Sequence, residues 1–236
     1  MQARRPLLLV GLGLIAWLAY LIWRVLHTLL SDDPAVWAGD IAKFIKADRR
    51  NPPPEGVIVF TGSSSITFWS TLERDMAPLP VLNRGFGGAR INQVAYYADQ
   101  IVIPYRPRAV VLFAGTNDIA WPKPKPAQEV YAGYLEFVNK VHSALPDVPI
   151  YYVGITPAPS RRQYWPIVQE ANRLIQAHTR TDPRLHYIDL TDKLSLPNGE
   201  PNTKLYRIDK LHPNTAGYAV WTSVIKPILE THLFWR

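Results

Sequence analysis

Five short apolar runs, each separated from the next by a longer segment, constrain the fold of this 236-residue chain more than any other feature. They are residues 57–61, 81–83, 109–114, 150–155 and 185–190. Apolar residues at helical spacing occupy residues 91–103, 127–144, 164–180 and 214–230. Short strands that alternate with helices are typical of a parallel sheet with crossover helices. We therefore predict an α/β fold, built as a three-layer α/β/α sandwich.

The third run indicates how the sheet is covered. Residues 109–114 read Ala-Val-Val-Leu-Phe-Ala, which is the pattern of a strand with helices on both faces. Three segments with glycine each follow the end of a predicted strand: residues 62–64, 87–88 and 115–117. Because open parallel sheets bind ligands beyond the carboxyl ends of their strands, we expect these segments to form one rim.

The first 30 residues form a separate region. Residues 6–23 contain no charged residue and follow Arg4 and Arg5. At about 1.5 Å per residue, such a stretch just spans the hydrocarbon core of a bilayer. Aromatic residues suited to a membrane interface gather toward its far end: Trp17, Tyr20 and Trp23. We predict a transmembrane helix here.

A cleaved signal peptide is the alternative for this region. Its apolar part is usually about 7–15 residues long and ends at a small-x-small site, which is not evident after residue 23. An uncleaved, single-pass anchor is therefore favoured. The arginines before the span place the N-terminus in the cytoplasm. The rest of the chain would lie on the periplasmic or extracytoplasmic side of a bacterial inner membrane.

This interpretation divides the chain into an anchor (1–30), an amphipathic helix with a proline-rich linker (31–55) and a catalytic domain (56–236). Within the middle part, Asp33 is a suitable N-cap and Pro34 a suitable first helical residue. The apolar stripe of this helix comprises Trp37, Ile41, Phe44 and Ile45.

The formal net charge of +7 suits an anionic partner, such as a membrane or an acidic polysaccharide. Lysines and arginines are scattered and form no nucleic-acid motif, so we expect no nucleic-acid partner. The chain has no cysteine, which excludes disulfides, thiolate metal sites and a cysteine nucleophile. The sequence does not indicate the oligomeric state.

Ser64 is the candidate nucleophile, in a turn that Gly62 makes possible. A serine hydroxyl attacks only when a base removes its proton. His212 is the candidate base, because Asp209, three residues earlier, can orient the imidazole and stabilise its charged form. Ser63 and Ser65 are also chemically possible nucleophiles, and Asp209 could instead be a helix cap.

Two further residues could stabilise the negative oxygen of a tetrahedral intermediate. Gly88 lets its backbone N–H approach closely, and Asn117 offers a side-chain amide. The N–H of the nucleophile Ser64 would be a third donor. Considered alone, the glycine segment could be a simple turn and Asn117 part of a helix cap.

Taken in order, these segments resemble the SGNH hydrolases, also called GDSL-type lipases and esterases. Four blocks carry the resemblance: Phe60-Thr-Gly62-Ser63-Ser64, Asn83-Arg-Gly-Phe-Gly-Gly88, Gly115-Thr-Asn117-Asp118 and Asp209-Lys-Leu-His212. The pattern is most similar to the platelet-activating-factor acetylhydrolase-like branch. Ser63 stands where the family usually has an aspartate that is not the triad acid.

The resemblance implies a five-stranded parallel sheet of flavodoxin-like type, a catalytic set of Ser64, Asp209 and His212, and oxyanion donors at Ser64, Gly88 and Asn117. It also implies that no metal and no cofactor is needed. Residues near the rim could contact substrate: Trp121, Tyr164 and Trp165, with Arg161 and Arg162 beside them.

The predicted function is that of a membrane-tethered serine esterase acting through an acyl-enzyme on Ser64. Its substrate would be a short acyl ester, a lysophospholipid or an O-acetylated glycan. Two alternatives stay open: an envelope O-acyltransferase that uses the same site, and a non-catalytic binding protein.

Overall fold

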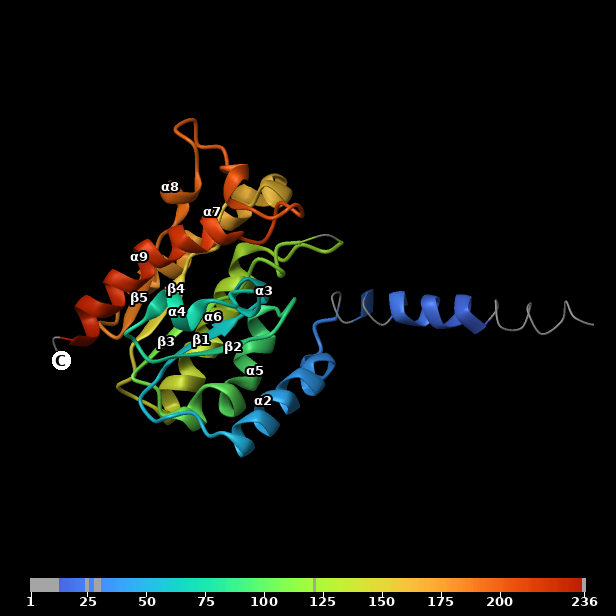
Figure 1. Cartoon of the computed structure of the whole chain (residues 1–236). Helices are drawn as coiled ribbons and strands as arrows, with labels where there is room; N and C mark the ends of the chain where they lie inside the picture. Colours follow the sequence, from blue (N-terminus) through green and yellow to red (C-terminus); the bar gives the residue numbers. More distant parts are fainter. Residues whose placement is uncertain (1–12, 24–25, 28–30, 121, 235–236) are drawn as a thin grey trace, which may run out of the picture.

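The fold is known from a computed structural model, which describes residues 13–23, 26–27, 31–120 and 122–234. Five strands form one sheet, all parallel, in the order β2-β1-β3-β4-β5 (Figure 1). The strands are β1 (Ile58–Gly62), β2 (Val81–Gly85), β3 (Ala109–Phe113), β4 (Ile150–Val153) and β5 (Leu185–Ile188). The prediction of a five-stranded parallel sheet is confirmed.

The longer helices fall where the apolar spacing predicted them. They are α2 (Ala38–Arg50), α5 (Ile91–Ile101), α6 (Ala127–Ala144), α7 (Trp165–Thr179) and α9 (Thr215–Phe234). The 3-10 turn η1 (Pro34–Trp37) lies within the helix predicted after Asp33. Other short elements were not predicted: α3 (Ser64–Thr67), α4 (Leu72–Met76), α8 (Thr191–Leu194), and the 3-10 turns η2 (Ile103–Tyr105), η3 (Pro159–Tyr164) and η4 (Thr203–Leu205). These are too short for a repeating apolar pattern to reveal them.

Successive side chains of a strand point to opposite faces of the sheet, so alternate residues of each strand pack into two separate cores. On one face of the sheet, Val110 and Leu112 pack with residues of α2, α5, α6 and α7. On the other face, Val111 and Phe113 pack with residues of α4 and α9. The sheet is therefore the middle layer of three, and the apolar character of β3 follows from burial on both sides.

The segment after the predicted anchor packs on the sandwich. Asp33 Oδ1 accepts the backbone N–H of Ala35 at 2.9 Å, which caps η1. Trp37 and Ile41 are buried, and Trp37 Nε1 donates to Gln93 Oε1 on α5 at 2.8 Å. The predicted cap at Asp33 is confirmed, but the helix begins as a 3-10 turn and becomes α-helical only at Ala38.

Residues 13–23 form a helix that projects away from the sandwich (Figure 1). Its large apolar side chains are exposed; Ile15 is 66% exposed and Trp17 is 59% exposed. The first half of the predicted membrane span, residues 6–12, lies outside the described residues. Among those that are described, no helix has both the length and the apolar character needed to cross a bilayer.

Candidate active site

The strand register brings the predicted blocks to one edge of the sheet. Gly62, the last residue of β1, pairs with Gly85 of β2 and with Phe113 of β3. The three strands therefore end at the same level, and the chain leaves each of them at the same rim. Ser64, Gly88 and Asn117 all lie within four residues of these ends.

Gly62 makes the turn that presents Ser64. Its φ of +135° is a conformation that side chains rarely adopt, and a Cβ there would meet the carbonyl oxygen of Phe113 at 1.9 Å. The Ser63 N–H donates to that same oxygen at 3.0 Å, so β1 turns directly into α3. Asn83 Nδ2 donates to the carbonyl of Ile66 at 2.7 Å and fixes α3 against β2.

Ser64, His212 and Asp209 form one connected chain of hydrogen bonds. Ser64 Oγ lies 2.7 Å from His212 Nε2, although the two residues are 148 positions apart. His212 Nδ1 lies 2.8 Å from Asp209 Oδ2. Because an ionised carboxylate only accepts hydrogen bonds, Nδ1 carries the proton and Nε2 is free to accept from the serine hydroxyl. This tautomer is the one that a general base requires.

The loop that carries His212 is held by Asp209 itself. Asp209 Oδ1 accepts the backbone N–H groups of Leu211 at 2.9 Å and His212 at 3.0 Å. Burial acts to raise the pKa of Asp209, but the hydrogen bonds from His212 and Leu211 outweigh it and lower the pKa to about 2. The alternative of a helix cap is wrong, since α9 begins only at Thr215.

Phe68 and Arg207 complete the surroundings of the imidazole. The Phe68 ring lies edge-on to His212, with ring centroids 4.8 Å apart. Arg207 Nη2 donates to the Phe68 carbonyl at 3.3 Å, and its guanidinium lies 5.0 Å above the Phe68 ring. Neither residue was among the predicted site residues, because no pattern distinguishes one aromatic or one arginine from its neighbours.

The predicted oxyanion donors lie on the loops that follow β1, β2 and β3. Gly88 has a φ of +79°, and among the described residues neither its N–H nor that of Ser64 donates to another group. Asn117 Nδ2 donates to the carbonyl of Ala89 at 3.0 Å, which fixes the amide against the glycine loop. Since a primary amide has two N–H bonds, this contact leaves one for a substrate oxygen.

Asp118 lies behind these donors, with only 1% of its surface exposed. It accepts the N–H of Ile91 at 3.0 Å, at the start of α5, and lies 3.4 Å from Lys125 Nζ. Burial raises the pKa of Asp118 to about 6, and the nearby charges of Lys125 and Arg90 lower it only in part.

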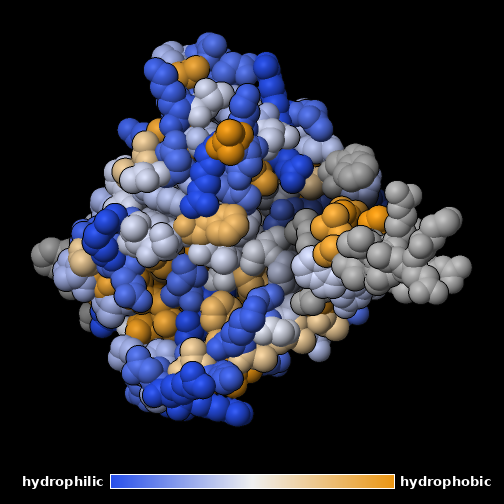
Figure 2. Space-filling view, turned by 45° about the vertical axis from the view of Figure 1, so that its right-hand side comes forward, coloured by the Kyte–Doolittle hydropathy of each residue, from blue (hydrophilic) through white to orange (hydrophobic). Residues whose placement is uncertain are grey.

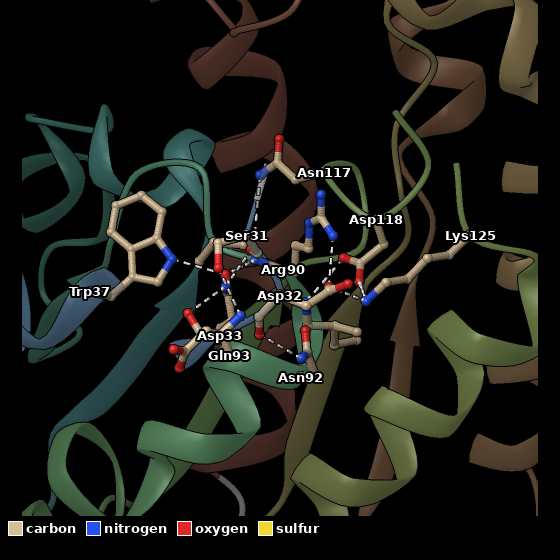
Figure 3. A network of polar contacts seen from close by, with 12 residues as sticks. Ser31, Asp32, Asp33, Trp37, Arg90, Asn92, Gln93, Asn117, Asp118 and Lys125 are labelled. Carbon is tan, nitrogen blue, oxygen red and sulfur yellow. Dashed lines mark hydrogen bonds and ion pairs between the residues drawn. The ribbon is translucent and has the colours of Figure 1, made fainter. Parts of the chain in front are cut away.

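The network continues outward to the start of the folded region (Figure 3). Asp32 Oδ1 lies 2.6 Å from Arg90 Nη1 and 2.7 Å from Lys125 Nζ, so one carboxylate bridges two cations. Gln93 Nε2 donates to the carbonyl of Ser31 at 2.9 Å. Asp32, Arg90 and Lys125 were not among the predicted site residues, and of this group with Asp118, only Asp118 belonged to a recognised block.

The predicted substrate contacts have mixed outcomes. Trp121 lies outside the described residues. Tyr164 and Trp165 are partly buried against the core beside α7. Trp165 and Arg162 line a hollow of about 290 Å³ together with residues 157–158 and 199–201, and neither Ser64 nor His212 lines it. The structure therefore does not bring these two aromatic residues into contact with the Ser64 hydroxyl.

A parallel α/β/α sandwich with a linked serine, histidine and aspartate at the carboxyl edge of its sheet defines a serine hydrolase architecture. The chain belongs to the GDSL-like Lipase/Acylhydrolase family, whose model matches residues 55–220. This confirms the resemblance that the four sequence blocks indicated. No match was found among curated proteins.

Several solved structures share the fold. One from Streptococcus pneumonia, named for platelet activating factor, is 20% identical with a TM-score of 0.72, over 91% of this chain and 98% of that one. A GDSL-like lipase from Bacteroides thetaiotaomicron VPI-5482 is 20% identical with a TM-score of 0.70, over 82% and 98%. A carbohydrate esterase family 3 protein from Talaromyces cellulolyticus is 15% identical with a TM-score of 0.61, over 77% and 99%. At these identities the likeness concerns the fold.

Proposed function

We propose that this protein hydrolyses carboxylic esters through an acyl-enzyme on Ser64. The observation that carries the proposal is the continuous link from Ser64 Oγ through His212 to Asp209, at 2.7 Å and 2.8 Å. Family membership supports the reaction class, since the family is one of lipases and acylhydrolases. Ser63 and Ser65 are both buried, and neither has a hydrogen bond to a histidine among the described residues.

Acylation begins when Ser64 Oγ attacks the ester carbonyl carbon and His212 Nε2 takes the hydroxyl proton. The carbonyl π electrons move to oxygen, and the N–H groups of Ser64 and Gly88 with the Asn117 amide stabilise that negative charge. Collapse breaks the bond to the alcohol, which leaves with the proton from His212. Asp209 stays ionised and stabilises the imidazolium.

Deacylation repeats these steps with water as the nucleophile. His212 removes a proton from water as the oxygen attacks the acyl carbon, and it returns that proton to Ser64 Oγ when the acid leaves. Short acyl esters, lysophospholipids and O-acetylated glycans all fit this chemistry. The carbohydrate esterase among the similar structures is a reason to include acetylated glycans in the assay.

We further propose that the N-terminal region anchors the protein in a bacterial inner membrane, with the catalytic domain on the extracytoplasmic side. The exposed apolar side chains of residues 13–23 support this placement, because such a surface is unfavourable in water. Arg4 and Arg5 ahead of the apolar stretch support the orientation.

The test is the hydrolysis of C2 to C12 esters and O-acetylated glycans by wild type, Ser64→Ala and the neighbouring control Ser65→Ala. We expect Ser64→Ala to lose at least about a thousandfold in kcat, as loss of a triad nucleophile does. A fluorophosphonate probe should label wild type and Ser65→Ala but not Ser64→Ala. Equal labelling of all three would disprove the assignment. Acyl transfer to an added glycan in place of acetate release would favour the transferase.

A further inference from the structure

We infer that the rim carrying Ser64 faces an anionic phospholipid surface, and that the ester substrate is an amphiphile held in that surface. This inference rests on the proposed function and narrows its substrate class. It is carried by three features of the described residues, which are the attachment point of the N-terminal helix, the apolar side chains beside His212, and unpaired cations on the same loops.

The N-terminal helix joins the domain beside the oxyanion loop. The Ser31 N–H donates to the carbonyl of His27 at 3.0 Å, which links His27 to the start of the folded domain. Ser31 and Asp32 are then held by Gln93 and Arg90, which lie five and two positions after Gly88. The helix leaves the domain on the side where the loop after β3 and the loop carrying His212 also project (Figure 1).

Apolar side chains are exposed beside His212. Ile208 precedes Asp209 and is 101% exposed, and Phe68, which contacts His212, is 40% exposed. The Ile208 loop is not loose, because the Arg207 N–H donates to the His212 carbonyl at 2.8 Å and the Ser160 N–H to the Lys210 carbonyl at 3.0 Å. A rigid loop that holds a fully exposed isoleucine next to the general base is suited to insertion among lipids.

The charges on these loops favour an anionic surface. In the described part of the chain, the exposed cations of the surrounding loops form no ion pair: Lys123, Lys204, Arg207 and Lys210. Of the nearby carboxylates, Asp32 lies between Arg90 and Lys125, and Asp209 hydrogen-bonds to His212 and keeps its negative charge. Figure 2 shows isolated hydrophobic residues among hydrophilic ones on a face turned partly toward the helix. Each basic residue near an anionic membrane contributes about 1 kcal/mol to binding.

This arrangement determines how a substrate would reach the serine. The helix attaches next to the loop that carries Gly88, and Ile208 lies next to the Asp209–His212 loop, so a bilayer that contacts both faces the Ser64 hydroxyl. An amphiphile in that bilayer presents its ester at high local concentration. A fully soluble ester gains nothing from the same orientation.

The absence of cysteine allows a direct test with the full chain in vesicles of anionic phospholipid. Ile208→Cys and Asp147→Cys are each labelled with an environment-sensitive fluorophore, and brominated lipids serve as the quencher. Asp147 is exposed and precedes β4, so it marks the opposite edge of the sheet. We expect quenching at position 208 and none at 147. No quenching at 208, or equal quenching at both, would overturn the inference.

Activity provides the second readout, as the ratio of rates on a vesicle-embedded ester and on p-nitrophenyl acetate. Ile208→Ser should lower this ratio about tenfold, the loss expected when one isoleucine side chain no longer leaves water. Ile208→Leu should preserve the ratio, and an unchanged ratio in Ile208→Ser would overturn the inference. If wild type hydrolyses neither ester while position 208 is quenched, the proposed function fails and the membrane-facing orientation stands.

Discussion

Two charged groups flank Ser64, and they are built in opposite ways. On the base side, Asp209 and His212 lie three positions apart in one loop, and 44% of the Asp209 side chain is exposed. On the oxyanion side, three segments of the chain supply Asp32, Arg90, Asp118 and Lys125, and Asp118 is buried. The first group depends on local geometry, whereas the second exists only when the whole fold has formed.

The pKa values of the two carboxylates show the same contrast. Hydrogen bonds from its own loop overcome the effect of burial at Asp209 and lower its pKa to about 2. Burial prevails at Asp118 and raises its pKa to about 6. Asp209 is therefore a stable anion that serves the imidazole, and Asp118 is a buried charge that depends on its neighbours. The following changes test whether the two sides also differ in what they contribute.

The largest effect is expected on the base side. His212→Gln removes the group that accepts the Ser64 proton at 2.7 Å, so kcat should fall by at least about a thousandfold. His142→Gln, at a histidine whose ring hydrogen-bonds to the Val148 carbonyl, is the matched control and should keep its activity. Steady-state hydrolysis of p-nitrophenyl acetate measures both. Similar losses in the two variants would indicate a general effect on folding rather than loss of a base.

On the oxyanion side, Asn117→Ala should reduce kcat by about a hundredfold, the loss typical of one oxyanion donor. Because the donor acts in the transition state, kcat and kcat/KM should fall together. The substitution also removes the contact with the Ala89 carbonyl, so thermal unfolding must be followed in parallel. A rise in KM with unchanged kcat would show that Asn117 only shapes the wall of the site.

The buried carboxylate predicts a pH-dependent difference in stability. With a folded pKa near 6 against 3.8 unfolded, Asp118 takes up a proton on folding between these values. Wild type should therefore lose stability relative to Asp118→Asn as pH rises from about 4 to 7. A difference of about two pKa units corresponds to roughly 3 kcal/mol.

Urea unfolding at several pH values measures this difference. Asp99→Asn, at an exposed carboxylate on α5, gives the baseline. Parallel curves for wild type and Asp118→Asn would contradict a raised pKa at Asp118. If wild type instead loses stability relative to Asp118→Asn as pH falls, the charges of Lys125 and Arg90 outweigh the effect of burial on the Asp118 pKa.

The contrast between the local base side and the assembled oxyanion side explains which parts of the fold and of the candidate site could be predicted from the sequence. The strands and long helices were predicted because each has its own apolar period, and His212 was chosen because Asp209 stands three residues before it. Arg90, Lys125 and Asp32 carry no such local mark, since a pairing across 58 positions leaves no periodicity in the sequence. Sequence motifs therefore located the proposed catalytic residues, and only the fold showed which residues hold the loop of the proposed oxyanion donors.

The smallest effect tests whether the segment before α2 belongs to the site. Asp32→Asn leaves Arg90 and Lys125 with one carboxylate, Asp118, in place of two. A charged hydrogen bond is worth about 1.5–3 kcal/mol, and solvent screening reduces this at Asp32, so kcat should fall roughly tenfold at most. Asp33→Asn is the control, because its side chain caps η1 and makes no contact with Arg90 or Lys125.

The fragment 31–236 should be soluble and active, and the fragment 38–236 should be much less active because it lacks Asp32 and Trp37. Equal activity of the two fragments would show that residues 31–37 only connect the anchor to the domain.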